Sequence, residues 1–259
     1  MARSWRLVAA EQLVHTDALE LAASDIVVVD LEAGTPEDRK AAARDALVAH
    51  LDTGHRTWVR VNGTDTEHWT DDLALVAADD RIDGVVLAMT EHGDQVRATL
   101  DAGRRPVVAM VETALSILNL PEIAASGPSR IAFGTGDFRR DLGVGPDRTA
   151  LLYARSQLVI ASRAHDLPGP IDGPTVSDDA EQTRADTQHA VTLGMTGRIC
   201  LTATQTAVVN EVCAPSSSDV VAARDLLDAP PEGYAGAVGP RLAHARQVLH
   251  RAGIYGIDA

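Results

Sequence analysis

Three features are scarce in this chain of 259 residues, and each scarcity excludes a class of protein. The two cysteines, Cys200 and Cys213, are too few for a disulfide framework and lack the spacing of a zinc site. Aromatic residues make up only 3%, so the core must consist of Ala, Val, Leu and Ile. No apolar run approaches the length of a membrane span, and the first residues lack the apolar segment of a secretion signal. We therefore expect a cytoplasmic protein without a membrane partner.

Basic residues are also few relative to acidic ones. The 23 Lys and Arg stand against 37 Asp and Glu, which gives a formal net charge of −14. This charge opposes attraction to phosphate backbones and anionic lipids, and no cluster of Lys or Arg interrupts it. We expect no nucleic-acid partner. With 45% hydrophobic and 23% charged residues, the composition is that of a folded globular protein.

Short apolar runs alternate with longer segments of helical periodicity along most of the chain. Eight runs predict strands, the first of them weakly, at residues 7–10, 25–32, 57–62, 84–89, 106–113, 130–137, 170–173 and 198–202. The segments between them predict helices at residues 17–24, 36–51, 65–78, 94–102, 116–126, 149–165 and 179–193. This alternation predicts a (β/α)₈ TIM barrel, because a doubly wound open sheet would need fewer repeats.

Local signals place some of the helix ends. Asp17 is positioned to cap the first helix, and Thr35 with Asp38 resembles a capping box. Pro121 should interrupt the helix at residues 116–126.

The tail beyond Cys213 predicts helices at residues 218–227 and 241–252, separated by a Pro/Gly-rich stretch. We predict a barrel domain of residues 1–214 and a C-terminal helical extension of residues 215–259. The extension could contact a neighbouring subunit, and a lid over the chain's own barrel is equally allowed.

In a barrel, functional residues lie at the C-terminal ends of the strands, where the following loops converge. Four of the predicted strands end in carboxylates and one ends in an arginine. The polar residues at these ends are Asp30 with Glu32, Arg60 with Asn62, Glu112 with Thr113, Asp137, Asp172 and Thr202.

Two of these acids, Glu112 and Asp137, come from successive strands and suit a hard cation such as Mg²⁺. Arg60 across the mouth could hold a substrate carboxylate bidentately. Together they predict a site that chelates a 2-oxo acid, with the metal polarising its carbonyl and stabilising the enolate formed when a carbon–carbon bond breaks. Gly134 and Gly136 would let the backbone approach the ligand closely. A strand-end acid is as often a helix N-cap or half of an ion pair, so the metal interpretation depends on the two acids together.

Six segments resemble, in the same order and over nearly the whole chain, motifs of the citrate lyase beta-subunit group of the HpcH/HpaI aldolase and malyl-CoA lyase superfamily. They are VVVDLEAG at residues 27–34, RVN at 60–62, VETA at 111–114, FGTGD at 133–137, IDGP at 171–174 and VNEVCAP at 209–215. The resemblance implies a Mg²⁺-dependent barrel that forms a homo-oligomer, a trimer or hexamer. It also implies substrates that are CoA or acyl-carrier-protein thioesters of 3-hydroxy acids, cleaved to or made from a 2-oxo acid.

By similarity to this family, Glu112 and Asp137 match the metal ligands, and Arg60 matches the residue that grips the substrate carboxylate. The resemblance thus implies that Arg60 and Glu112 are catalytic and that Gly136 and Asp137 join them in binding substrate. Lys40 and Arg44 fall where the family has basic residues near the CoA phosphates, although a solvated helix face is an equal interpretation.

The chain also departs from the family pattern at three places. Ala33 replaces an acid, residues 200–205 read CLTATQ where the family usually has CIHPSQ, and residues 237–240 lack the Asp that relatives carry before the tail proline. Proton transfer would then need another group, with Asp30, Glu32 and Asp172 as the nearest candidates. We therefore predict a Mg²⁺-dependent carbon–carbon lyase. The alternative is a catalytically weakened relative that binds Mg²⁺ and a 2-oxo acid as a sensor or structural subunit.

Overall fold

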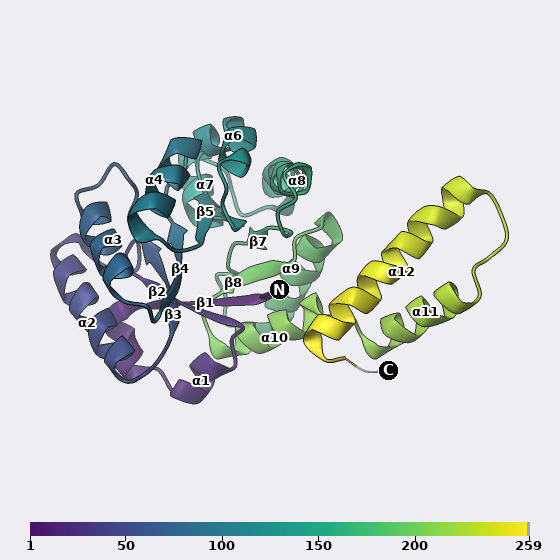
Figure 1. Cartoon of the computed structure of the whole chain (residues 1–259), viewed down its shortest axis with the longest axis horizontal. Coiled ribbons are helices and arrows are strands. Elements are labelled where there is room, and N and C mark those ends of the chain that lie inside the picture. Colours follow the sequence, from purple (N-terminus) through teal and green to yellow (C-terminus); the bar gives the residue numbers. More distant parts are fainter. Residues whose placement is uncertain (258–259) are drawn as a thin grey trace. The chain divides into compact units, whose positions relative to one another are not determined.

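The computed structural model describes residues 1–257, and residues 2–209 are built on a closed barrel of eight parallel strands (Figure 1). The strands are β1 (Ser4–Ala9), β2 (Ile26–Asp30), β3 (Thr57–Val61), β4 (Ile82–Leu87), β5 (Val107–Val111), β6 (Arg130–Phe133), β7 (Ile171–Asp172) and β8 (Gly197–Cys200). Each strand pairs with the next in parallel, and β8 pairs with β1 to close the ring. The predicted (β/α)₈ TIM barrel is confirmed.

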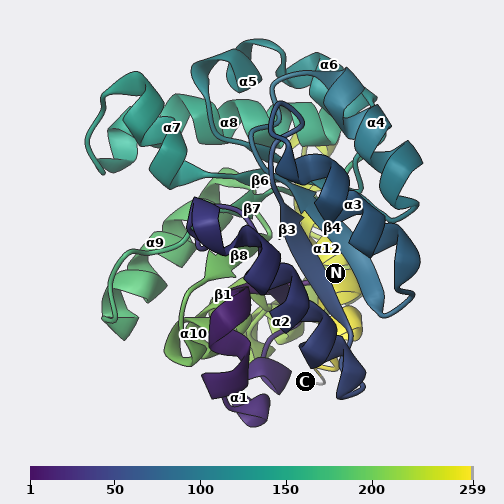
Figure 2. The same cartoon turned by 90° about the vertical axis from the view of Figure 1, so that its left-hand side faces the viewer.

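Helices surround the strands, as Figures 1 and 2 show from two directions. They are α1 (Ala18–Ala22), α2 (Lys40–Asp52), α3 (His68–Ala78), α4 (Gly93–Gly103), α5 (Ala114–Leu118), α6 (Leu120–Ala125), α7 (Thr135–Leu142), α8 (Arg148–Ala164), α9 (Ala180–Leu193) and α10 (Ala203–Cys213). Two short 3₁₀ helices, η1 (Ala10–His15) and η2 (Glu37–Arg39), precede α1 and α2.

Successive side chains of a strand point alternately into the barrel and toward the helices outside it. In β5, Val108 and Met110 join an interior cluster to which all eight strands contribute, whereas Val107, Ala109 and Val111 pack in the outer clusters. Because the period is two, Glu112 continues the inward row of Val108 and Met110. The same counting puts Asp30 in line with Val28, and Arg60 in line with Trp58.

Two of the local predictions are confirmed and one is wrong. The side chain of Asp17 accepts a hydrogen bond from Leu19 N and caps α1. Pro121 sits in the first turn of α6 and separates it from α5. The capping box at Thr35 does not form, because the Thr35 hydroxyl donates instead to the carbonyl of Asp30.

Two α-helices were not predicted from the sequence. Strand β6 ends at Phe133 and α7 begins at Thr135, so Asp137 lies in the first turn of a helix rather than at the end of a strand. Helix α10 follows β8 directly. Its Thr and Asn content is not typical of a helix, and this explains why its sequence gave a weak signal.

From Asn210 onward the chain, with Met1, forms a second compact unit. Helices α11 (Ser217–Asp228) and α12 (Ala235–Tyr255) pack against each other as a hairpin (Figure 1). Helix α12 starts earlier than the predicted residue 241 and carries Pro240 in its interior. Contact of this unit with a neighbouring subunit stays a prediction.

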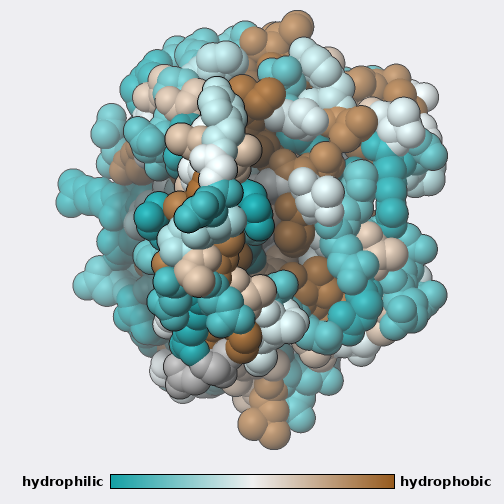
Figure 3. Space-filling model, turned by 90° about the vertical axis from the view of Figure 1, so that its right-hand side faces the viewer, coloured by the Kyte–Doolittle hydropathy of each residue, from teal (hydrophilic) through white to brown (hydrophobic). Residues whose placement is uncertain are grey.

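The surface of the molecule is mixed in character. On the face shown in Figure 3, hydrophobic and hydrophilic residues are interspersed. Within residues 1–257, no helix is both long enough and apolar enough to span a bilayer.

Candidate active site

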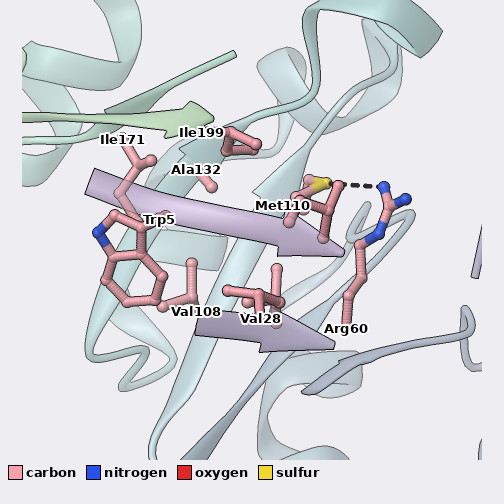
Figure 4. Close-up of a pocket in the computed structure, with 10 residues that line it drawn as sticks. Trp5, Val28, Arg60, Val108, Met110, Ala132, Ile171 and Ile199 are labelled. Atoms are coloured by element: carbon pink, nitrogen blue, oxygen red, sulfur yellow. Dashed lines mark hydrogen bonds between the residues drawn. The ribbon is translucent and has the colours of Figure 1, made fainter. Parts of the chain in front are cut away.

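The barrel interior is filled below its mouth, so a ligand that enters the barrel must bind at the rim. Trp5, Val28, Val108, Met110 and Ile199 are among the side chains that pack there, and Arg60 lies at the edge of the same small void (Figure 4). Arg60 directs Nη1 at Met110 Sδ, 3.9 Å away. The guanidinium therefore forms the floor of the mouth, directly above an apolar core.

Arg60 is held by two acids from the end of β2. Its Nε donates to Asp30 Oδ1 at 2.7 Å and its Nη2 to Asp30 Oδ2 at 2.5 Å, a bidentate pair, while Nη1 lies 3.1 Å from Glu32 Oε2. Burial opposes the positive charge, but Asp30 above all keeps the pKa of Arg60 raised. Burial would also raise the pKa of Asp30, yet the charge of Arg60 lowers it overall. Both groups are thus ionised, and the orientation of Arg60 is fixed.

Glu112 is 1% exposed and has one oxygen that nothing else uses. Its Oε1 accepts a hydrogen bond of 2.6 Å from Met89 N, whereas its Oε2 is buried and has no hydrogen-bond partner among residues 1–257. Burial raises the pKa of Glu112 to about 8, with smaller raising effects from Glu32 and Asp137. A carboxylate in this state is stabilised by a cation bound at Oε2.

Met89, whose backbone N–H donates to Glu112, has a strained backbone conformation. It has φ of 50°, in the left-handed region that costs a residue with a Cβ about 1–2 kcal/mol. Such strain persists at sites where the surrounding structure fixes the conformation. The role of Met89 could not be predicted from the sequence, because residue type does not show the backbone conformation of a loop.

Asp137 is the second acid at this side of the mouth. Its charge acts on Glu112, and its Oδ1 lies 2.6 Å from Nη1 of Arg140, a residue one turn along α7. The Arg140 side chain is 76% exposed, so this pair is screened by solvent and easily exchanged. The two predicted metal ligands are therefore electrostatically coupled, and Glu112 is free of any basic hydrogen-bond partner in the described chain.

The glycines beside these acids differ in their surroundings. A Cβ added at Gly134 would lie 2.1 Å from Glu112 Oε2, so only glycine leaves room for that carboxylate. A Cβ at Gly136 would meet nothing within 4 Å. The predicted close approach of a ligand at Gly136 stays a prediction, whereas Gly134 is required by the packing of Glu112 itself.

The donor set fits a hard divalent cation. It offers one buried carboxylate oxygen without a partner and a second acid close enough to raise the pKa of the first. A different group, Glu37 with Glu67 and His68, gathers possible ligand atoms within 4.8 Å on the surface. There Glu37 and His68 already bond to each other at 2.6 Å, as an exposed ion pair would.

Known proteins are similar to this chain in architecture and in sequence. The HpcH/HpaI aldolase/citrate lyase family matches residues 5–203. The chain belongs to this family. A (3S)-malyl-CoA thioesterase from Cereibacter sphaeroides is 35% identical over 207 residues, 76% of this chain and 72% of the relative. A citrate lyase subunit beta-like protein from Deinococcus radiodurans is 33% identical over 82% of this chain and 79% of its own.

A solved structure is similar over nearly the full length. The crystal structure of protein CitE from Mycobacterium tuberculosis, in complex with magnesium, acetoacetate and coenzyme A, has a TM-score of 0.84 and 29% sequence identity. The alignment covers 97% of this chain and 98% of that one. The resemblance on which the sequence analysis relied is confirmed at the level of the HpcH/HpaI family.

Two basic residues that the family resemblance associates with CoA phosphates have other partners in this chain. Lys40 is the only lysine among the 259 residues, and it is 7% exposed. Its Nζ donates to Leu31 O, Glu32 O and Asn62 Oδ1 at 2.7–2.8 Å, which uses all three ammonium hydrogens. Arg44 donates to Asp72, whose other oxygen accepts from Asn62.

These contacts give Lys40 a structural task in this member of the HpcH/HpaI family. It ties the end of β2, with Glu32, to the end of β3, with Asn62. A planar guanidinium cannot replace a compact ammonium among three converging oxygens, which explains why a chain rich in arginine keeps one lysine here.

We expect Lys40→Met to lower the free energy of unfolding by about 2–4 kcal/mol, because three buried acceptors lose a charged donor. Urea unfolding measures this. Arg39→Met is the matched control, since Arg39 is the preceding residue and its pair with Glu11 is exposed and worth about 0–1 kcal/mol. Equal losses in the two variants would contradict the role of Lys40.

Asp172 is not part of the mouth, which corrects its grouping with the other strand-end acids. Ile171 belongs to the interior cluster, so Asp172 faces outward, where Arg155 of α8 and Arg198 of β8 bind it. The tail departure is also visible in the structure, since the first turn of α12 contains no acidic residue.

Proposed function

We propose that this chain is a Mg²⁺-dependent carbon–carbon lyase that cleaves a 3-hydroxyacyl thioester into an acyl thioester and a 2-oxo acid, or catalyses the reverse condensation. The observation that carries the proposal is Glu112 Oε2, a buried carboxylate oxygen that lacks a partner in residues 1–257 and lies in the field of Asp137. Support also comes from relatives named L-malyl-CoA/beta-methylmalyl-CoA lyase, 31% identical to this chain, and from the magnesium complex of CitE.

In this proposal Glu112 and Asp137 hold Mg²⁺, which would polarise the carbonyl oxygen of the oxo acid. Asp30 occupies Nε and Nη2 of Arg60, so Arg60 would bind the substrate carboxylate through Nη1 and not through the bidentate edge. Glu32 Oε2, 3.1 Å from Nη1, would have to move aside for that carboxylate. Asp30 therefore orients the guanidinium rather than reacting. The apolar packing beneath Arg60 keeps water from reaching it from inside the barrel.

Glu32 is our candidate for proton transfer at the substrate hydroxyl. Of the three acids that could replace the missing family groups, Asp30 is bound on both oxygens by Arg60, and Asp172 lies outside the barrel wall. The Glu32 side chain is 20% exposed and lies at the mouth beside Arg60. Its location next to the guanidinium places it within reach of a substrate held there.

A second candidate function is that of a weakened relative that binds Mg²⁺ and a 2-oxo acid without turnover. The observation that favours it is the absence of any acid from the first turn of α12, within the part of the tail that the structure describes. The cytoplasmic location and the trimer or hexamer stay predictions, and light scattering of the purified protein would give the oligomer's mass.

The test is turnover of malyl-, citramalyl- and citryl-CoA with Mg²⁺ or with a chelator. We expect equal amounts of 2-oxo acid and acyl-CoA, and a loss of at least about 100-fold in Asp137→Asn. Asp94→Asn is the matched control, because Asp94 also lies in the first turn of a helix and pairs with an arginine three residues on.

Two other outcomes would contradict the lyase proposal, and a third would contradict the role of Asp137. Binding of oxaloacetate with no turnover of any thioester supports the weakened relative. Release of free CoA without a 2-oxo acid means thioester hydrolysis, the activity for which the Cereibacter sphaeroides relative is named. Full activity of Asp137→Asn removes that residue from the metal site.

A further inference from the structure

A second hollow lies outside the ring of strands, away from the inward-facing acids. It is a cleft of about 690 Å³ lined by α7, the first turns of α8, the loop after β7, α9 and β8. Because Ile171 and Ile199 face the barrel interior, their neighbours Asp172 and Arg198 face this outer side. The mouth of the barrel and this α8–α9 cleft therefore lie on opposite sides of the barrel wall, although Gly136 of α7, which is predicted to bind substrate, also lines the cleft.

Basic groups outnumber acidic ones in the α8–α9 cleft, although the whole chain carries a charge of −14. Its lining includes four arginines, which are Arg139, Arg148, Arg155 and Arg198. The acids at hand are Asp147 and Asp186 in the lining and Asp172 behind it. Four positive charges against three negative ones leave an excess of positive charge.

Two of these arginines share the carboxylate of Asp172. Arg155 Nε lies 3.0 Å from Asp172 Oδ1, and Arg198 Nη1 lies 2.7 Å from Asp172 Oδ2. All three side chains are at most 8% exposed. Asp186 Oδ2 also lies 3.9 Å from Arg198 Nη2, but Asp186 pairs with Arg148 as well, so two carboxylates face three guanidinium groups. Buried excess charge is unfavourable unless another anion approaches.

The lining also holds nitrogen atoms without partners. Arg139 Nε, Arg198 Nε and His189 Nε2 are buried and make no hydrogen bond to any residue that the structure describes. A buried donor left unpaired costs about 1–3 kcal/mol, and native proteins leave few of them. Two of these three atoms, Arg139 Nε and Arg198 Nε, can only donate, whereas His189 Nε2 donates or accepts according to its tautomer. Two such donors on residues that line one cleft favour a ligand that supplies acceptor oxygens.

We propose that the α8–α9 cleft binds an oxyanion, a phosphate or carboxylate group, through Arg139, Arg148 and Arg198. Guanidinium groups bind such oxyanions bidentately, and the excess positive charge of the cleft favours them. Helix α7 carries both the cleft residue Arg139 and the mouth residue Asp137, so an anion here lies beside the proposed catalytic centre. The inference does not depend on the reaction assigned to that centre.

The test is a calorimetric titration of the full chain with inorganic pyrophosphate in Mg²⁺-free buffer. We expect saturable binding that Arg139→Met weakens at least about tenfold. Arg139 makes no ion pair with any residue between 1 and 257, so this variant should fold. Arg163→Met is the matched control, because Arg163 lies exposed in the last turn of α8, outside the cleft, and it should bind as the wild type does.

Further arms identify the source of the oxyanion and separate this inference from the proposed reaction. Displacement of pyrophosphate by CoA but not by pantetheine supports a phosphate group of the thioester as the bound oxyanion. Displacement by citrate supports a free carboxylate as the bound oxyanion. Glu112→Gln should keep pyrophosphate binding, whatever becomes of turnover. Absence of binding in the wild type, or equal weakening in Arg139→Met and Arg163→Met, would overturn the proposal.

Discussion

Gly134→Ala is expected to lower Mg²⁺ affinity and Mg²⁺-dependent turnover by about 10–100-fold or more. The new Cβ would lie 2.1 Å from Glu112 Oε2 and 2.6 Å from Glu112 Cβ, closer than real contacts allow. The backbone of Gly134, with φ of −82° and ψ of 75°, is not left-handed, so the effect is steric. Glu112 must move, and Oε2 leaves the position where it meets the cation.

The control for this variant is Gly145→Ala, where a Cβ would meet nothing within 4 Å. It should keep both affinity and turnover. Calorimetric titration with Mg²⁺ separates loss of metal from loss of fold, and urea unfolding should show a cost of about 1–3 kcal/mol for the overpacked site. Unchanged Mg²⁺ affinity in Gly134→Ala would show that Glu112 Oε2 is not a ligand atom.

Glu112→Gln is expected to remove a pH dependence from the stability of the Mg²⁺-free protein. The pKa of Glu112 is raised from 4.5 to about 8, chiefly by burial. Between these values the folded chain holds a proton that the unfolded chain has released, so stability is highest below pH 4.5 and falls as the pH rises toward 8. Each pH unit in this window costs up to about 1.4 kcal/mol.

The measurement is urea unfolding with a chelator at several pH values between about 5 and 8. The wild type should lose stability relative to Glu112→Gln as the pH rises, and Mg²⁺ should restore it in the wild type alone. Glu181→Gln, an exposed acid on α9, should follow the wild type. Parallel curves for the wild type and Glu112→Gln would mean that Glu112 ionises freely in the folded chain.

The strands and the acids at the barrel mouth could be predicted from the sequence. The strands appear as apolar runs, and the acids lie at or directly after the strand ends. A run such as residues 107–111 is apolar on both faces, and the acid that follows it must emerge at the strand's C-terminal end. Counting by two along β2, β3 and β5 then aligns Asp30, Arg60 and Glu112 on the inner face. The metal ligands stay predictions, whereas the barrel itself is confirmed.

Other features could not be predicted, since they depend on contacts between segments far apart in the chain. The outward orientation of Asp172 follows from β7, a strand of two residues that is too short to show a pattern. The bond from Met89 to Glu112 joins residues 23 apart and needs a backbone angle that the residue type disfavours. The sequence left Lys40 either near the CoA phosphates or on a solvated helix face. Its actual acceptors are backbone carbonyls and an amide that no motif reveals.

The location of Lys40 has a practical consequence for labelling. Reagents that acylate or cross-link lysine side chains have one target in these 259 residues, and that target is enclosed by oxygen atoms. Modification of this ammonium by an amine-reactive reagent therefore reports separation of the ends of β2 and β3. The rate of that single modification, measured by mass spectrometry, reports how often the barrel rim opens transiently.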